Sequence, residues 1–431
     1  MARVTADLGS TYSDAVVVVA VAGIVVVVCL VALGMVGLHW YVWRRLVRDT
    51  TARGSVGRRV GTGVIVAGPL LLIGAFVAER AEAPFLLTRI ISWPGYLWGA
   101  LFVYLVLWLL AGELVRPFFR RWIARADTLA AQVEPELVPA TGNAMPDRPD
   151  LPDRPAPVSR RLFVSRAVSG AAGLAAVATV GYGAHGVLAG PRVERLAVPL
   201  ANLPRAGHGY RIAVVSDIHL GPILGRGFAE RVVDTINGTQ PDLIAVVGDL
   251  VDGSVEHLRS AVEPLSRLRA RHGAYFVTGN HEYFAGAEQW IEHVQDLGLR
   301  LLANSRTELP HFDLAGVNDM QGESIGQGPD FAAALGDRDP ARTAVLLAHQ
   351  PVQIHDAVEF GVDLQLSGHT HGGQIWPGNL LAGLANPTVA GLERYGDTQL
   401  YVTRGAGAWG PPVRIGAPSD ITVIELASKQ T

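Results

Sequence analysis

Five short segments in the C-terminal half of the chain combine aspartate, asparagine and histidine at close spacing. Imidazole nitrogens and carboxylate or amide oxygens are donors that divalent metal ions use in proteins. A single Asp-x-His or Gly-Asp pair is common in loops, but five such segments together predict a metal centre. The segments are Ser216-Asp217-Ile218-His219, Gly248-Asp249-Leu250-Val251-Asp252, Gly279-Asn280-His281-Glu282, Ala348-His349 and Gly368-His369-Thr370-His371.

Such a donor set suits a pair of metal ions. Two divalent ions about 3.5–4 Å apart can clamp a phosphoryl group and lower the pKa of a bridging water, so that hydroxide attacks in line near neutral pH. One carboxylate must bridge the ions, and imidazoles and carboxylates fill the remaining positions. The spacings Asp-x-His and His-x-His let neighbouring residues approach the ions from different sides. The residues therefore indicate phosphoryl-transfer chemistry.

The elements that must position these side chains are short apolar runs of β character with helical stretches between them, which predict an α/β domain. The metal-binding residue types follow the ends of these runs, and ligands at strand ends converge at one edge of a sheet. The expected strands are 211–215, 243–247, 274–277, 344–347, 364–366, 400–403 and 421–425.

In order and in type, the five segments resemble the signature of the calcineurin-like metallophosphoesterase superfamily. Within this superfamily, the chain is similar to the membrane-linked phosphodiesterase branch, which includes the YkuE- and YaeI-like proteins. The motifs that carry this similarity are Ser-Asp-Ile-His-Leu-Gly, Gly-Asn-His-Glu-Tyr and Ser-Gly-His-Thr-His-Gly-Gly-Gln. The resemblance covers residues 205–427. It implies a domain of two packed mixed β-sheets flanked by helices, and an enzyme that cleaves phosphodiesters in preference to monoesters.

The resemblance also implies roles for single residues and two divalent metal ions per domain. His281 is expected to protonate the leaving-group oxygen or to stabilise charge on it, with Asp252 orienting it. Glu282 stands where aspartate is commoner and is not expected to touch the metals. The ligand types accept Mn, Fe, Zn or Ca. The implied ligands are Asp217, His219 and His371 for the first ion, Asn280, His349 and His369 for the second, and Asp249 as the bridge.

The N-terminal part has a different composition. The chain of 431 residues is 49% hydrophobic and only 17% charged, and nearly all of its long uncharged runs lie before residue 191. Runs of this length and composition predict membrane spans at residues 16–38, 60–78, 96–112 and 167–190. A net charge of −3 excludes a basic nucleic-acid-binding protein. The single cysteine excludes both an intramolecular disulfide and a thiolate metal cluster.

Four regions are therefore expected along the chain. They are a three-span transmembrane region (1–125), a Pro-rich cytoplasmic linker (126–160), a fourth span with a twin-arginine-like lead (161–190) and the metallophosphoesterase domain (191–431). Arginines crowd the loop between the first two spans and the segment after the third, whereas the loop between the second and third has few. Because arginine-rich loops stay in the cytoplasm, this multi-pass chain should place its catalytic domain outside the cell membrane.

The lead of the fourth span, Ser159-Arg160-Arg161-Leu162-Phe163-Val164, resembles a twin-arginine export signal placed internally. It suggests the twin-arginine export machinery as a partner, which carries folded proteins. The alternative is that the two arginines serve only as cytoplasmic anchors. Both interpretations place the C-terminal domain outside.

Substrate contacts are less sharply indicated. Arg394 and Arg404 are candidate phosphate contacts beyond the metals. Residues 376–392 carry no charge and contain Trp376, Leu380, Leu381, Leu384 and Val389 with three glycines. They should lean toward the lipid bilayer or grip an acyl or prenyl chain, or else pack as a hairpin on the domain core. A membrane tether favours a membrane-proximal or lipid-linked phosphate ester as substrate. The alternative function is a gated receptor or scaffold that uses the fold for binding, although such a protein should have lost ligands.

Overall fold

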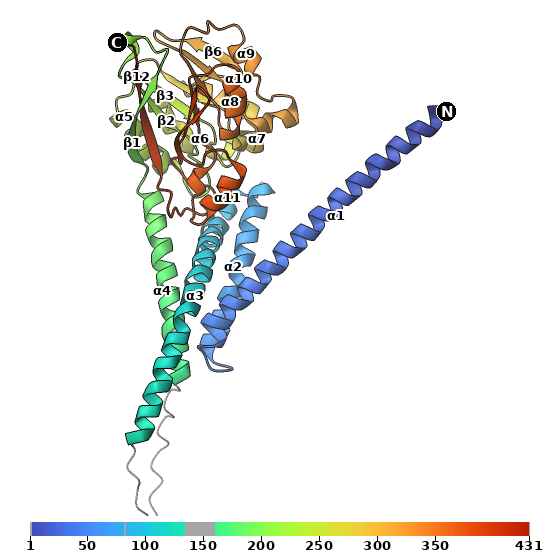
Figure 1. The fold of residues 1–431 in the computed structure, drawn as a ribbon, viewed down its shortest axis with the longest axis vertical. Helices are drawn as coiled ribbons and strands as arrows, with labels where there is room; N and C mark the ends of the chain where they lie inside the picture. The colour runs from blue at the N-terminus through green and yellow to red at the C-terminus, as the bar shows by residue number, and fades with distance from the viewer. Residues whose placement is uncertain (1, 82, 134–159, 431) are drawn as a thin grey trace, which may run out of the picture. The chain divides into compact units, whose positions relative to one another are not determined.

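The structure, a computed structural model, describes residues 2–81, 83–133 and 160–430. These form two compact units (Figure 1): Met1–Ala67 with Phe102–Val177, and Gly68–Leu101 with Ala178–Thr431. The boundary between the units falls within three long helices, so that each of these helices contributes to both. The expected Pro-rich linker lies outside the described residues from position 134 to position 159, and the helix before it ends at Val133.

The first unit is helical. Polar contacts join its segments, since the Trp43 indole donates to the Thr62 hydroxyl at 2.9 Å and Arg45 pairs with Glu113 at 3.0 Å. The Ser169 hydroxyl also donates to the carbonyl of Arg45 at 3.0 Å. The helices that contribute to this unit are α1 (Ala2–Trp43), the π-helical η1 (Arg44–Arg48), and parts of α2 (Val56–Arg80), α3 (Phe85–Val133) and α4 (Arg160–Leu188).

Four helical segments are long and apolar enough to cross a membrane: Ala22–Arg48, Val56–Arg80, Phe85–Phe119 and Leu162–Leu188. Each covers one of the runs that composition singles out. In the first segment, Val25 and Val28 expose 54% and 60% of their surface. Apolar side chains exposed around a whole helix are stable in a bilayer rather than in water.

The second unit contains two six-stranded mixed sheets. The first has the order β1-β12-β2-β3-β4-β5 and the second the order β10-β11-β9-β8-β7-β6. The strands of the first sheet are β1 (Arg192–Leu200), β2 (Tyr210–Val215), β3 (Leu243–Val247), β4 (Ala274–Val277), β5 (Arg300–Leu301) and β12 (Asp420–Ser428). Those of the second are β6 (Ser305–Glu308), β7 (Asp313–Gly316), β8 (Ala344–Leu347), β9 (Leu364–Ser367), β10 (Gly391–Tyr395) and β11 (Thr398–Val402).

Helices cover the outer faces of both sheets. α5 (Arg226–Gly238), α6 (Val255–Val262) and α8 (Ala287–Asp296) pack on the first sheet, and α9 (Phe331–Leu335) and α10 (Ile354–Glu359) pack on the second. The remaining helices are α7 (Asn280–Ala285), which follows β4, and α11 (Gly378–Ala385), which has no buried residue. Single-turn 3₁₀ segments are η2 (Arg205–Gly207), η3 (Glu263–Arg267), η4 (Met320–Ile325), η5 (Pro351–Gln353) and η6 (His371–Gly373).

The core lies in three layers, because the central strands are apolar on both faces. Side chains of β2 alternate, with Ala213 and Val215 facing α5, α6 and α8, and Ile212 and Val214 facing the second sheet. A third cluster packs β7, β8 and β11 against α9 and α10. All seven expected strands are present, and the predicted α/β domain of two packed mixed sheets flanked by helices is confirmed.

Candidate functional site

The predicted ligands follow the carboxyl ends of neighbouring parallel strands. β2, β3 and β4 are parallel neighbours in the first sheet, as are β8 and β9 in the second. The segments after these strands come together, and three groups have donor atoms within 4.8 Å of one another. The first is Asp217, His219 and His371, and the second is Asp249, His349 and His369; the third, His219 with Asp252 and His281, contains the two predicted catalytic residues.

In the first group, two imidazoles face each other. The Nε2 atoms of His219 and His371 are 3.0 Å apart, and Nε2 of His371 lies 3.3 Å from Asp217 Oδ1. At this separation at most one of the two nitrogens can carry a proton that points at the other. The remaining lone pairs and the carboxylate form a donor set that fits a divalent cation.

In the second group, the environment of His349 selects the tautomer that a metal ligand needs. Its Nδ1 donates to the carbonyl of Val247 at 2.9 Å, which leaves Nε2 as the nitrogen with the free lone pair. This Nε2 is buried and, among the described residues, has no hydrogen-bond partner, although Asp249 Oδ2 is 3.2 Å away. Asn280 Oδ1 lies 3.1 Å from Nδ1 of His369, which brings the predicted amide ligand to the same place.

Asp249 lies between the two groups. Its Oδ2 is 3.2 Å from Nε2 of His349 and 3.8 Å from Nε2 of His219, one residue from each group. Its Oδ1 accepts from the backbone N–H of His281 at 2.9 Å. Burial by itself raises the pKa of this carboxyl, but the surrounding imidazoles, His349 above all, outweigh burial and hold the pKa well below its usual range. The position and charge of Asp249 therefore suit a shared ligand.

His281 and His219 are both oriented by Asp252. Its Oδ1 accepts from Nδ1 of His281 at 2.7 Å and from Nδ1 of His219 at 2.9 Å. Burial opposes a charge on His281, but the Asp252 carboxylate outweighs burial and raises the pKa of His281 to about 9. Its Nε2 lies 4.0 Å from Asp249 Oδ2, so an imidazolium faces the candidate metal site.

The histidines of the last segment have the opposite tendency. Burial, followed by the neighbouring His349, lowers the pKa of His369 to about 4, and burial together with His219 lowers that of His371 well below its usual value. Both rings are thus neutral, the form in which imidazole binds a metal.

The backbone around the site is strained. Left-handed φ angles are rare for residues with a side chain and cost about 1–3 kcal/mol each, so they concentrate at functional sites. Close approach also requires glycine at two neighbouring positions, because a Cβ at Gly279 would overlap Asp249 and one at Gly368 would overlap Ser216. The predicted ligands with positive φ are Asp217 (52°), His219 (49°), Asp249 (52°), His369 (71°) and His371 (52°).

Two further residues support the site, and sequence patterns did not reveal their roles. Glu282 is fully buried and accepts backbone N–H bonds from Asp249 (3.0 Å), Leu250 (2.7 Å) and Gly279 (2.6 Å), so it fixes two of the ligand-bearing loops. The buried Arg414 donates to the His371 carbonyl at 3.0 Å. Glu282 adjoins a motif, whereas Arg414 belongs to none.

The two arginines predicted to contact phosphate differ in position. The side chain of Arg404 packs beside Gly372, directly after His371, and pairs with Asp420 at 3.3 Å. Arg394 is largely exposed and donates to the carbonyl of Gly396 at 3.0 Å. The geometry thus places Arg404, but not Arg394, against a ligand-bearing segment.

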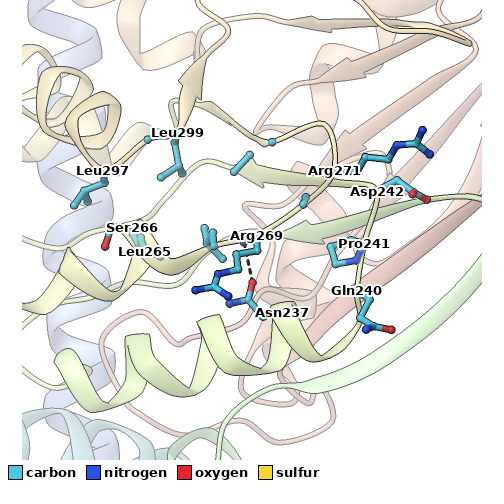
Figure 2. A pocket seen from close by; sticks show the side chains of 15 residues that line it. Asn237, Gln240, Pro241, Asp242, Leu265, Ser266, Arg269, Arg271, Leu297 and Leu299 are labelled. Atoms are coloured by element: carbon cyan, nitrogen blue, oxygen red, sulfur yellow. Dashed lines mark hydrogen bonds between the residues drawn. The ribbon is translucent and has the colours of Figure 1, made fainter.

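A pocket of about 660 Å³ in the second unit does not contain these groups. Figure 2 shows its walls, where the Arg269 backbone N–H donates to the Asn237 side chain at 2.9 Å. It adjoins Asp242 and Ala274, at the amino ends of β3 and β4, and so lies at the edge of the sheet opposite the predicted ligands.

Comparison with known proteins agrees with this geometry. Residues 210–373 match the family model described as calcineurin-like phosphoesterase. A zebrafish (Danio rerio) transmembrane protein with metallophosphoesterase domain is 39% identical over 57% of this chain and 59% of its own length. An uncharacterized metallophosphoesterase of Helicobacter pylori is 38% identical over 59% of this chain and 69% of its own.

The metallophosphoesterase YkuE of Bacillus subtilis, also uncharacterized, is 29% identical over 63% of this chain and 98% of its own length. The matched region thus spans less than two thirds of the zebrafish relative. The resemblance expected from the five motifs is confirmed, and with its apolar helices the chain is a membrane protein. The chain belongs to the calcineurin-like phosphoesterase family.

Proposed function

We propose that the protein is a membrane-anchored, two-metal phosphoesterase that prefers phosphodiesters and acts on a membrane-proximal or lipid-linked phosphate ester. The observation that carries this proposal is the pair of donor groups that share Asp249. The Nε2 of His349 further supports a bound ion, because it is buried and has no hydrogen-bond partner among the described residues, an arrangement that is costly unless a ligand satisfies it.

In this proposal one ion would be held by Asp217, His219 and His371, and the other by Asn280, His349 and His369, and Asp249 would contribute to both sites. When bound, two divalent ions supply Lewis-acid neutralisation of the phosphoryl oxygens and a water of lowered pKa. Mn, Fe, Zn and Ca all remain compatible with these donors.

The chain's own contribution to bond cleavage is a proton. His281, held as an imidazolium by Asp252, directs Nε2 toward the candidate site and can donate to the leaving-group oxygen. Nearby cations lower the pKa of His281 from about 9, which moves it toward the pH range where a general acid is most effective.

Two features of the second unit support an extracytoplasmic catalytic domain close to the bilayer. Phe85, the first residue of α3, packs against the core cluster of the domain, and residues 81–84 before it contain no arginine, whereas Arg53 lies between η1 and α2 and Arg58 and Arg59 lie in the first turn of α2. In addition, α11 has no buried residue, and Leu380, Leu381 and Leu384 are 65–85% exposed. These side chains suit the membrane interface rather than the core. Export through the twin-arginine machinery stays a prediction.

The test is hydrolysis of an aryl phosphodiester and the matching monoester by the full chain in lipid nanodiscs, with metal content measured on the same sample. Asp249→Asn is the key variant and Asp356→Asn, an exposed carboxylate on α10, the matched control. We expect metal-dependent cleavage that favours the diester and that disappears only in Asp249→Asn. A chain that binds two ions and cleaves neither ester would instead favour a gated receptor or scaffold.

A further inference from the structure

A second pocket, of about 540 Å³, adjoins His281 and Asp252. One wall comes from the domain, including Phe284 and Trp409. The other comes from the ends of α2 and α3, including Phe76, Arg80 and Phe85. All of these residues belong to the same compact unit, Gly68–Leu101 with Ala178–Thr431. Its volume is in the range of pockets that bind small molecules.

Specific contacts hold this helical hairpin against the domain. Phe85 packs against the core cluster that lies under the first sheet, and its ring stacks on His257 at a centroid distance of 5.5 Å. The Arg80 guanidinium lies 5.4 Å from the centroid of the Phe284 ring. The hairpin is therefore part of the pocket and not merely a neighbour of it.

The hairpin itself is tightly packed. A Cβ at Gly95 would meet the Leu71 carbonyl, and one at Gly68 would overlap the ring of Trp98, so glycine permits the close approach of α2 and α3. Near the pocket, the Glu79 carboxylate accepts from the hydroxyls of Tyr96 at 2.5 Å and Ser92 at 3.2 Å. These contacts preorganise the helical wall.

The aromatic side chains of the pocket present open surface beside the predicted proton donor. Phe76, Phe284 and Trp409 expose 44%, 49% and 49% of their surface. The ring of His281 lies 5.5 Å from that of Phe284 and 5.8 Å from that of Trp409. Exposed apolar surface of this kind, gathered in a concave site, marks a place where a ligand binds.

We propose that this pocket binds the apolar chain of a membrane lipid whose phosphate ester lies at the predicted metal ligands around Asp249. The α2–α3 hairpin thereby forms part of the substrate site. A lipid is the occupant because one wall of the pocket is formed by α2 and α3, two helices that are long and apolar enough to cross the bilayer. This assignment rests on the proposed phosphoesterase function and adds the substrate class and the residues that select it.

The test measures binding separately from catalysis. The probes are n-alkylphosphonates from methyl to hexyl, whose C–P bond resists hydrolysis, titrated calorimetrically into Mn-loaded full-length protein in phosphatidylcholine nanodiscs, with empty nanodiscs subtracted. Each methylene that enters an apolar site strengthens binding up to about fourfold, so the hexyl compound should bind at least tenfold more tightly than the methyl compound.

Phe76→Ala and Trp409→Ala should reduce the preference for hexyl over methyl severalfold. Phe163→Ala, the same substitution at an exposed position on α4, should retain the preference of the unmodified chain. Equal affinity for both phosphonates, or a preference that survives both pocket substitutions, would overturn the proposal.

A second measurement needs no variant. A phosphatidic acid analogue with a photoactivatable chain should cross-link to peptides that contain Phe76 or Phe284, and hexylphosphonate should compete. Cross-links confined to other segments would contradict the assignment. Hydrolysis of the aryl phosphodiester in parallel separates the two ideas, because chain-independent hydrolysis leaves the phosphoesterase standing and removes only the lipid pocket.

Discussion

Replacing Asp252 by asparagine should separate proton donation from metal binding. One oxygen of Asp252 accepts from the imidazole N–H groups of both His281 and His219. His281 is the predicted proton donor and His219 a predicted metal ligand. Asp252→Asn keeps the shape of the side chain but removes the charge that stabilises the imidazolium of His281.

The structure allows the size of the effect to be worked out. Burial lowers the pKa of His281, but Asp252 outweighs burial and raises the pKa to about 9; without Asp252 only Asp249 and Glu282 still oppose burial, so the pKa should fall to about its ordinary 6.5. At pH 8 the protonated fraction then falls from about 0.9 to about 0.03, a loss of about thirtyfold. Bound cations lower the pKa in both proteins, but the difference between them persists.

The assay is the pH dependence of kcat for two aryl phosphodiesters in the metal-saturated full chain. A phenolate leaving group needs a proton more than a nitrophenolate does, so Asp252→Asn should slow the phenyl ester more. The decline of kcat at high pH should also begin at a lower pH. Metal affinity should fall about 10- to 100-fold because His219 loses its support, and metal content is therefore measured on each sample.

His281→Gln serves as the reference, since it removes the titrating group altogether, and Asp356→Asn controls for loss of a carboxylate. If Asp252→Asn slows both esters equally and leaves the pH profile unchanged, the assignment of His281 as proton donor is wrong.

Three further outcomes are expected. Glu282→Gln should lower the free energy of unfolding by about 1–3 kcal/mol, because the amide turns an N–H toward a backbone donor; an unchanged denaturation midpoint would refute its role in holding the loops. Burial lowers the pKa of His349, but Asp249 and its neighbours outweigh burial and raise the pKa well above its usual value. At pH 7 metal binding should therefore release a proton, and metal affinity should increase as the pH rises toward that pKa. Calorimetry in two buffers with different ionisation enthalpies measures this proton release, and finding none would contradict the prediction. Leu380→Ser with Leu384→Ser should reduce cross-linking of α11 to photoactivatable lipids in nanodiscs that hold the full chain, and equal cross-linking would exclude α11 as a membrane contact.

Much of the fold could be predicted because the central strands are short apolar runs, each followed by a polar motif. The missed strands lack this pattern. β1 contains Pro199 and several charged residues and lies at the edge of its sheet, where proline and charge are tolerated. β7 reads Asp-Leu-Ala-Gly and is nevertheless fully buried, because its Asp313 pairs with Arg342 at 2.8 Å. Tertiary contacts of this kind override local preference.

In the candidate site, too, some residues could be predicted from the sequence and others could not. Motif spacing identified the donors that converge, since sheet topology turns strand ends into neighbours. It did not identify Arg414, which reaches His371 from a distant segment, nor the left-handed backbone of five predicted ligands. The role of Arg394 stays a prediction, because an arginine near a strand end carries no information on where its side chain points, and here it pairs with Asp397 at 3.4 Å.

The packing of the α2–α3 hairpin indicates that the membrane region has a role beyond anchoring the domain. A simple tether would need no contact with the domain. Phe85 nevertheless packs against the core cluster of the domain, and Val187 at the end of α4 is fully buried in the same cluster as β2 and α5. Gly410 also lies close to α3, since a Cβ there would be 3.7 Å from the Tyr96 ring. Cutting the chain before β1 would expose these apolar surfaces and open one wall of the pocket beside His281. The domain and the hairpin therefore form a single structural unit, and the membrane helices take part in building the site as well as anchoring it.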